Sequence, residues 1–192
     1  MSTGAQHREH LAAALALEAE AQRLLLAGER SRAAASFRDA AEQYKASWEL
    51  APPGSYGRLV GMLKAAVLGE AGDSEAAYAS AQLAAAPADS PTAAYGRAIC
   101  ALIDGDDSAA SRWAGVMQGG SDAFERAAGA IAAIAAHDDD HYAAAIAQIV
   151  ADFEARTEHL TGVAIADTAL MLTRLGTLRG LHAELASAVL PS

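Results

Sequence analysis

Apolar residues recur at steps of three and four along almost the whole chain, and no stretch alternates apolar and polar residues for long. Residues 31–50 illustrate the pattern, because one face of a helix there would carry Ala34, Phe37, Ala41, Tyr44 and Trp48. A helix with such an apolar stripe must bury it against another element. The sequence therefore predicts an all-α protein in which helices pack on helices.

The composition favours a single domain built from closely packed helices. Alanine makes up roughly a quarter of the chain, far above ordinary usage, and it combines the highest helix propensity with a small side chain. Hydrophobic residues are 53% of the 192 positions and charged residues 20%, which is enough for one core. We expect a flexible N-terminus at residues 1–8 and a single all-helical domain at residues 9–192.

Glycine, proline and polar residues divide the pattern into about nine helices. Ser90 followed by Pro91 is the strongest start signal, since serine caps helix N-termini and proline suits the first helical position. The expected helices cover residues 9–27, 31–50, 55–70, 74–86 and 91–104, a short segment with Trp113 and Met117, a segment after Ser121, one that begins within 137–142, and 159–175. A last short helix is expected in the tail, so that capping helices would occupy about 159–190.

Three turns of similar sequence suggest that the helices repeat in pairs, at 27–34, 71–77 and 104–110. The spacing of a glycine that ends one helix and of small and aromatic residues in the next resembles the tetratricopeptide repeat. The matching positions are Gly28, Ala33, Phe37 and Ala40, then Gly72, Ala77, Ala81 and Ala84, and more loosely Gly105, Ala110, Ala114 and Met117. The first-helix Trp and Leu-Gly signals of that family are missing.

The resemblance implies antiparallel helix pairs stacked as an α-solenoid over residues 10–155, and a non-enzymatic scaffold that binds a protein or peptide in its concave groove. Two helices open alike, as Tyr-Gly-Arg, and aromatic residues and arginines are common in binding hot spots. The candidate groove residues are therefore Tyr56, Arg58, Tyr95 and Arg97, although a position in the core suits the two tyrosines better than one in a groove. A compact irregular helical bundle is the alternative fold.

The segment 137–142, His-Asp-Asp-Asp-His-Tyr, has two interpretations. Histidines four residues apart on one helix face can share a metal ion, and carboxylates add oxygen ligands. A metal- or small-ligand-binding protein would then use His137, His141, Glu154, Glu158 and His159. Alternatively the segment is a turn, in which Asp139 or Asp140 caps the following helix and His137 ends the preceding one. We expect the turn, and we predict no cofactor.

Asp167 stands among the most apolar residues of the chain, and a buried aspartate needs a partner. Arg174 lies seven residues later, two helical turns along the same side, and is the expected partner. The alternative is an aspartate that is exposed or has another structural partner.

The net charge of the chain limits the kinds of partner that it is expected to bind. A formal net charge of −10 disfavours nucleic acid and anionic membranes and would suit a basic protein partner. The single Cys100 excludes an intrachain disulfide, and its apolar surroundings favour a core position. The start of the chain has no signal-peptide pattern, so we expect a cytoplasmic protein. A helical homo-oligomer, packed through alanine-rich faces, is a further alternative.

Overall fold

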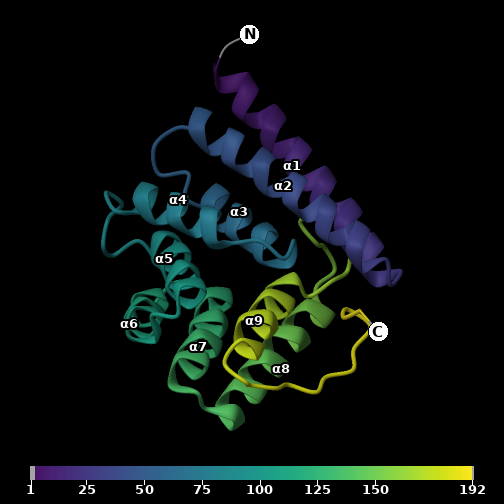
Figure 1. Cartoon of the computed structure of the whole chain (residues 1–192), viewed down its shortest axis with the longest axis vertical. Coiled ribbons are helices and arrows are strands. Elements are labelled where there is room, and N and C mark those ends of the chain that lie inside the picture. The colour runs from purple at the N-terminus through teal and green to yellow at the C-terminus, as the bar shows by residue number, and fades with distance from the viewer. Residues whose placement is uncertain (1–2, 192) are drawn as a thin grey trace.

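The computed structural model describes residues 3–191, and this part of the chain is all-helical, without a β-strand (Figure 1). The prediction of an all-α fold is confirmed. The nine helices are α1 (Thr3–Leu26), α2 (Arg30–Leu50), α3 (Gly57–Leu68), α4 (Asp73–Leu83), α5 (Pro91–Asp104), α6 (Asp107–Met117), α7 (Asp122–Ala136), α8 (Asp139–Ala155) and α9 (Asp167–Thr177). Among them, none combines the length and the hydropathy that crossing a lipid bilayer would require.

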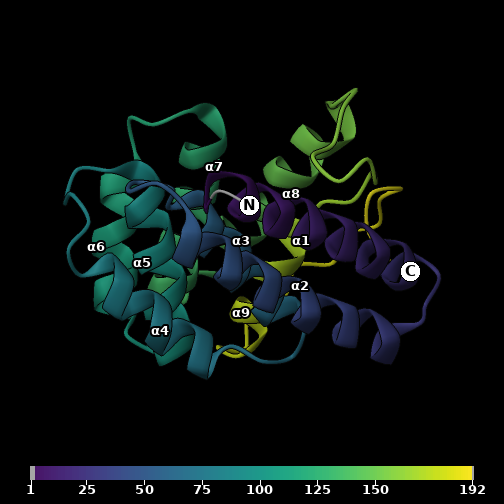
Figure 2. The same ribbon diagram turned by 90° about the horizontal axis from the view of Figure 1, so that it is seen from above.

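The first eight helices pack in chain order, each against the next, and short turns join them. The helices α1 and α2 form the longest hairpin and lie side by side in both views (Figures 1 and 2). The last helix breaks this order, since α9 returns to pack against α3, α7 and α8. The C-terminal part of the chain thus packs back on helices from its middle, and the all-α arrangement is consistent with a helical bundle or a solenoid.

Local sequence explains where α5 begins and ends. Ser90 accepts a hydrogen bond from the backbone N–H of Ala93 at 3.3 Å, and Pro91 is the first helical residue, as predicted. Gly105 ends the helix in a left-handed conformation, with φ of 75°, which a residue without a Cβ adopts at little cost. Asp106 then caps α6 by accepting from the N–H of Ala109 at 2.9 Å.

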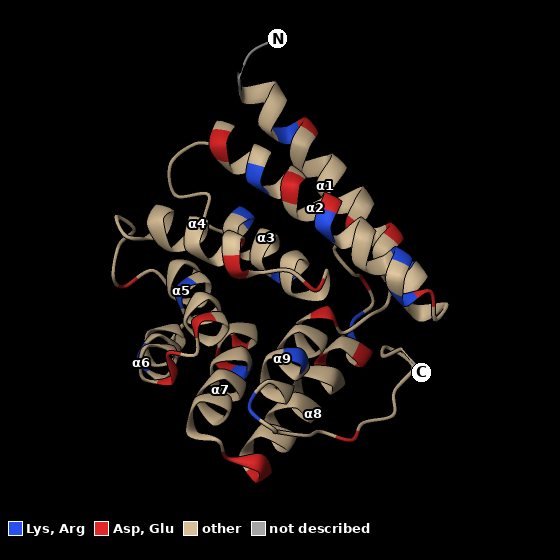
Figure 3. Cartoon of the chain, in the orientation of Figure 1, with Lys and Arg blue, Asp and Glu red and all other residues tan. Residues whose placement is uncertain are grey.

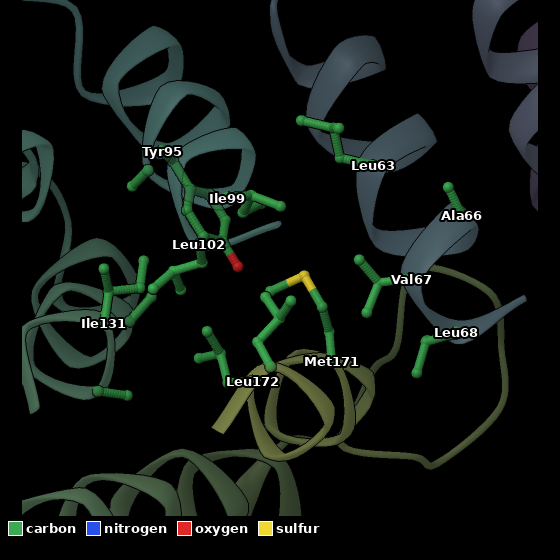
Figure 4. Packing of buried hydrophobic residues seen from close by; sticks show 14 of the residues in the cluster. Leu63, Ala66, Val67, Leu68, Tyr95, Ile99, Leu102, Ile131, Met171 and Leu172 are labelled. Carbon is green, nitrogen blue, oxygen red and sulfur yellow. The ribbon is translucent and has the colours of Figure 1, made fainter. Parts of the chain in front are cut away.

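The helix α9 packs into the core through large apolar side chains. Met171 and Leu172 of α9 are fully buried. Figure 4 shows them pointing into a space bounded by Val67 from α3, Ile99 and Leu102 from α5, and Ile131 from α7. The interfaces between successive helices are rich in buried alanine, which allows close approach but supplies little apolar area per residue. The large side chains around α9 therefore contribute much of the hydrophobic stabilisation.

The prediction for the C-terminal quarter of the chain is wrong in two places. The ninth helix begins at Asp167 instead of residue 159, because the preceding loop turns at Gly162, which has a φ of 72°. Residues 178–191 contain no helix and run along the outside of the molecule (Figure 1). They are held by buried apolar side chains such as Val189, whose carbonyl accepts from the N–H of Ala166 at 2.8 Å.

The N-terminal segment, for which we expected flexibility over residues 1–8, is helical from Thr3 onward. His7 in this segment is buried, and its carbonyl accepts a hydrogen bond from the Ser47 hydroxyl of α2 at 2.7 Å. Residues 1–2 of the predicted flexible segment lie outside the described part of the chain.

The contact between α8 and α9 depends on a glycine. A Cβ built at Gly176 would lie 2.7 Å from the hydroxyl oxygen of Tyr142, whose side chain is fully buried. We expect Gly176→Ala to lower the free energy of unfolding by about 1–3 kcal/mol, because the packed ring must shift. Gly115→Ala in α6 is the matched control, since nothing lies within 4 Å of its Cβ position. Denaturant unfolding of both variants measures the difference, and equal stabilities would contradict this account.

Candidate functional site

The structure places the two histidines of residues 137–142 at different helix ends. His137 follows α7 in a left-handed conformation, and its Nε2 lies 2.9 Å from Asp107 Oδ2 in the neighbouring turn. His141 belongs to the first turn of α8, where its Nδ1 lies 2.7 Å from Asp138 Oδ2. Asp138 is also the cap of α8, so the prediction of Asp139 or Asp140 in this role is wrong by one or two residues. Acidic residues follow one another along the chain at this turn (Figure 3).

The other three residues of the metal hypothesis are also separately engaged. Glu154 accepts a hydrogen bond from the Ser187 hydroxyl at 2.5 Å, Glu158 is exposed, and the ring of His159 stacks on Phe153 with centroids 6.2 Å apart. Within residues 3–191, no group of three or more His, Cys, Asp or Glu side chains is placed to hold a metal ion. The structure does not bring the five proposed ligands together.

Two of the four proposed groove residues, Tyr95 and Arg97, make their contacts within the fold. Tyr95 is buried and meets Phe124 edge-on, with ring centroids 5.9 Å apart. Arg97 donates to the carbonyls of Leu83 and Ala86 at 2.6 and 2.7 Å, which satisfies the C-terminal end of α4. Its guanidinium also lies over the ring of Trp113.

The other two residues lie at the start of α3. The ring of Tyr56 packs on that of Trp48, with centroids 5.8 Å apart. Arg58 donates from Nε to the hydroxyl of Ser47 at 2.9 Å, and its Nη2 lies 3.1 Å from Nδ1 of His7. Of the four residues, Arg58 alone lines the open groove described below.

A buried ionic cluster joins α1, α3 and α9. The ammonium of Lys64 lies 2.7 Å from Asp167 Oδ2 and 3.2 Å from Glu18 Oε1. The side chain of Lys64 is 15% exposed and that of Glu18 is fully buried. The contact with Glu18 is ionic, since Oε1 accepts no hydrogen bond of good geometry from the described residues. Two carboxylates therefore share one ammonium in the interior.

Neutral side chains complete this cluster. The Tyr44 hydroxyl donates to Glu18 Oε2 at 2.6 Å, and Gln22 Nε2 donates to Asp167 Oδ2 at 3.2 Å. Asp167 is thus buried and partnered, but Arg174 is not its partner. Arg174 instead pairs with Glu70 at 2.8 Å and donates to the carbonyl of Leu68, at the C-terminal end of α3.

Burial and charge shift two pKa values in the cluster. Burial acts to lower the pKa of Lys64, but Asp167 and Glu18 outweigh it and hold that pKa above its ordinary value of 10.5. Burial, reinforced by the negative charge of Glu18, raises the pKa of the Tyr44 hydroxyl above 10.0. Lys64 is therefore a fixed cation at neutral pH, and Tyr44 a fixed hydrogen-bond donor.

An open groove of about 530 Å³ lies on one side of Lys64. Its walls come mainly from α1, α3 and the turn before α3, and α2, α5 and the loop between α8 and α9 each add one residue, namely Tyr44, Thr92 and Leu160. Leu11, Leu15 and Val60 are each partly exposed there, and Leu160 at the rim is 80% exposed. Arg58 and Lys64 are the charged residues among the lining side chains, and both are cations.

A smaller cavity of about 140 Å³ lies on the other side of Lys64. It is more enclosed and more polar, with Gln22, Thr161 and Asp167 in its walls. The hydroxyl of Thr161 donates to Gln22 Oε1 at 2.5 Å, so these walls tie the loop before α9 to α1. Lys64 and Leu160 line both spaces.

In comparisons with known proteins, no family model, no curated protein and no solved structure matches the chain.

Removal of the cation alone from the ionic cluster should strongly destabilise the fold. We expect Lys64→Met to lower the free energy of unfolding by about 3–5 kcal/mol, because two buried carboxylates lose their counter-ion. The triple variant K64M/E18Q/D167N should lose less than K64M alone. Lys45→Met, at an exposed lysine of α2, should change stability by less than about 1 kcal/mol. A Lys64→Met variant as stable as Lys45→Met in denaturant unfolding would contradict the account.

The raised pKa values also predict sensitivity to alkali. Above about pH 10 the unfolded chain loses protons from tyrosine and lysine, whereas Tyr44 and Lys64 in the folded chain keep theirs. Stability should therefore be complete below pH 10 and fall as pH rises. Tyr44→Phe should make the fall shallower by up to about 1.4 kcal/mol per pH unit. Identical slopes for wild type and Tyr44→Phe in denaturant unfolding at several alkaline pH values would refute this role of Tyr44.

Proposed function

We propose that this chain is a non-enzymatic interaction protein that binds a segment of another protein in the groove between α1 and α3. The observation that carries the proposal is the groove itself, in which Leu11, Leu15, Val60 and Leu160 leave an apolar lining accessible. Its volume of about 530 Å³ falls in the range of ligand sites in proteins. Apolar side chains of a partner helix or peptide would cover this lining, as in other helix-in-groove complexes.

The position of α9 supports this choice of surface. Stacked helix pairs of the tetratricopeptide type, which the sequence resembles, bind partners on their concave side. Here α9 covers α3 and α7, and its side chains Met171 and Leu172 fill the space beside them. The groove beside α1 is a part of the stack that α9 leaves open.

Lys64 and Cys100 are candidate nucleophiles, and their protonation at neutral pH favours a binding function over catalysis. Lys64 keeps its proton because of Asp167 and Glu18, so its nitrogen has no lone pair to offer at neutral pH. Burial raises the pKa of the Cys100 thiol to about 11, which leaves little reactive thiolate. A cytoplasmic location, and the absence of a cofactor and of nucleic-acid binding, stay predictions of the sequence.

The proposal is tested by two leucine substitutions of matched exposure. Leu160 at the groove and Leu178 outside it are 80% and 72% exposed. Wild type, Leu160→Asp and Leu178→Asp would be immobilised and used to capture proteins from an extract of the producing cells. We expect at least one protein whose capture falls about tenfold or more with Leu160→Asp, because a charge in an apolar groove is costly, and stays unchanged with Leu178→Asp.

Thermal unfolding of both variants provides the control for folding. If no captured protein distinguishes Leu160→Asp from Leu178→Asp, the groove is not an interaction site and the proposal is wrong.

A further inference from the structure

The charges that line the groove differ from those of the whole chain. The formal net charge is −10, yet no Asp or Glu lines the groove, whereas Arg58 and Lys64 do. We infer that the partner segment presents the side-chain carboxylate of an aspartate or glutamate beside its apolar side chains, and that Arg58 binds this carboxylate. The inference rests on the proposed function, because it concerns the occupant of the same groove.

Arg58 is oriented but not neutralised. Its Nε donates to Ser47 at 2.9 Å, and its Nη2 lies within hydrogen-bond distance of His7 Nδ1, at 3.1 Å. Neither contact is with a carboxylate, and no carboxylate of residues 3–191 lies within ion-pair distance of the guanidinium. A guanidinium held in this way loses little further freedom on binding, and its remaining N–H groups can donate to a carboxylate.

Lys64 has a different role at the floor of the groove. Its ammonium forms ion pairs with Glu18 and Asp167, so these two carboxylates largely neutralise its charge inside the protein. It therefore adds to the preference for an anion without being the direct contact. Arg58, also among the lining residues, forms no ion pair with residues 3–191.

Local charge decides the contact even though the net charge is negative. The field of exposed charges is screened over about 8 Å at physiological salt, whereas a charge-assisted hydrogen bond acts at contact distance. The expected segment carries one acidic side chain next to large apolar ones and is otherwise neutral or basic. The net charge had predicted a basic partner, and this inference limits that expectation to the regions outside the groove.

A random twelve-residue peptide library fused to a phage coat protein provides the test. Fusion through the peptide C-terminus leaves no free terminal carboxylate, so a carboxylate in a selected peptide comes from Asp or Glu. The full chain would be used for selection, with Leu160→Asp as the counter-selection for groove binding. We expect the retained peptides to be enriched in large apolar residues together with at least one Asp or Glu.

A double-mutant cycle then assigns the contact. The selected peptide and its Glu→Gln or Asp→Asn analogue, both amidated, would be titrated against wild type, Arg58→Gln and Arg112→Gln. We expect the loss of the peptide carboxylate to weaken binding to wild type about tenfold, and binding to Arg58→Gln by less than about twofold. Arg112→Gln, at an exposed arginine of α6 outside the groove, should behave as wild type.

The outcomes separate this inference from the proposed function. Groove-dependent peptides without an acidic residue, or a carboxylate whose loss weakens binding to wild type and to Arg58→Gln equally, would overturn the inference and leave groove binding in place. If no peptide depends on Leu160, then groove binding itself is refuted and the inference falls with it.

Discussion

The apolar face of α9 is buried against helices from the middle of the chain, and much of the structure depends on this contact. Many buried residues of α1 to α8 are alanines, which let helices approach closely but supply little apolar area per residue. Met171, Leu172 and Leu175 of α9 add large buried side chains, and full burial of one such side chain is worth roughly 1.5–3 kcal/mol. They belong to the same core as the large side chains of the earlier helices, so α9 joins parts of the chain that are distant in sequence.

The ionic cluster at Lys64 fixes the orientation of α9, which hydrophobic contact alone does not fix. Hydrophobic burial alone would tolerate α9 in several rotations, whereas the Asp167 carboxylate must meet an ammonium to be buried at all. The loop before α9 is fixed at the same point, through Thr161 and Gln22. This places Leu160 at the rim of the groove, so the interior charges and the exposed apolar side chain belong to one arrangement.

Sequence reasoning succeeded where structure is local. The cap at Ser90 and the helix end at Gly105 depend on neighbours within four residues, and those signals can be read directly. It failed for the start of α9, because residues 159–166 are apolar enough for a helix, whereas the chain turns at Gly162 and Ala166 hydrogen-bonds to the distant Val189. Lys64 was overlooked, although a single charge within Gly-Met-Leu-Lys-Ala-Ala-Val-Leu is the same signal that drew attention to Asp167. Its partners, Glu18 and Asp167, are too distant in sequence for any periodicity to connect them.

The late position of α9 in the chain also has a kinetic consequence. During synthesis, α3, α5 and α7 leave the ribosome well before the helix that covers them. Until α9 arrives, residues such as Val67, Ile99 and Ile131 have no partner on that side, and nascent helices with exposed apolar faces are prone to aggregate. Pairing α9 with α3 also closes a loop of about a hundred residues, which slows folding relative to a simple array of neighbours. The feature that completes the native core therefore prolongs the interval in which the growing chain exposes apolar surface.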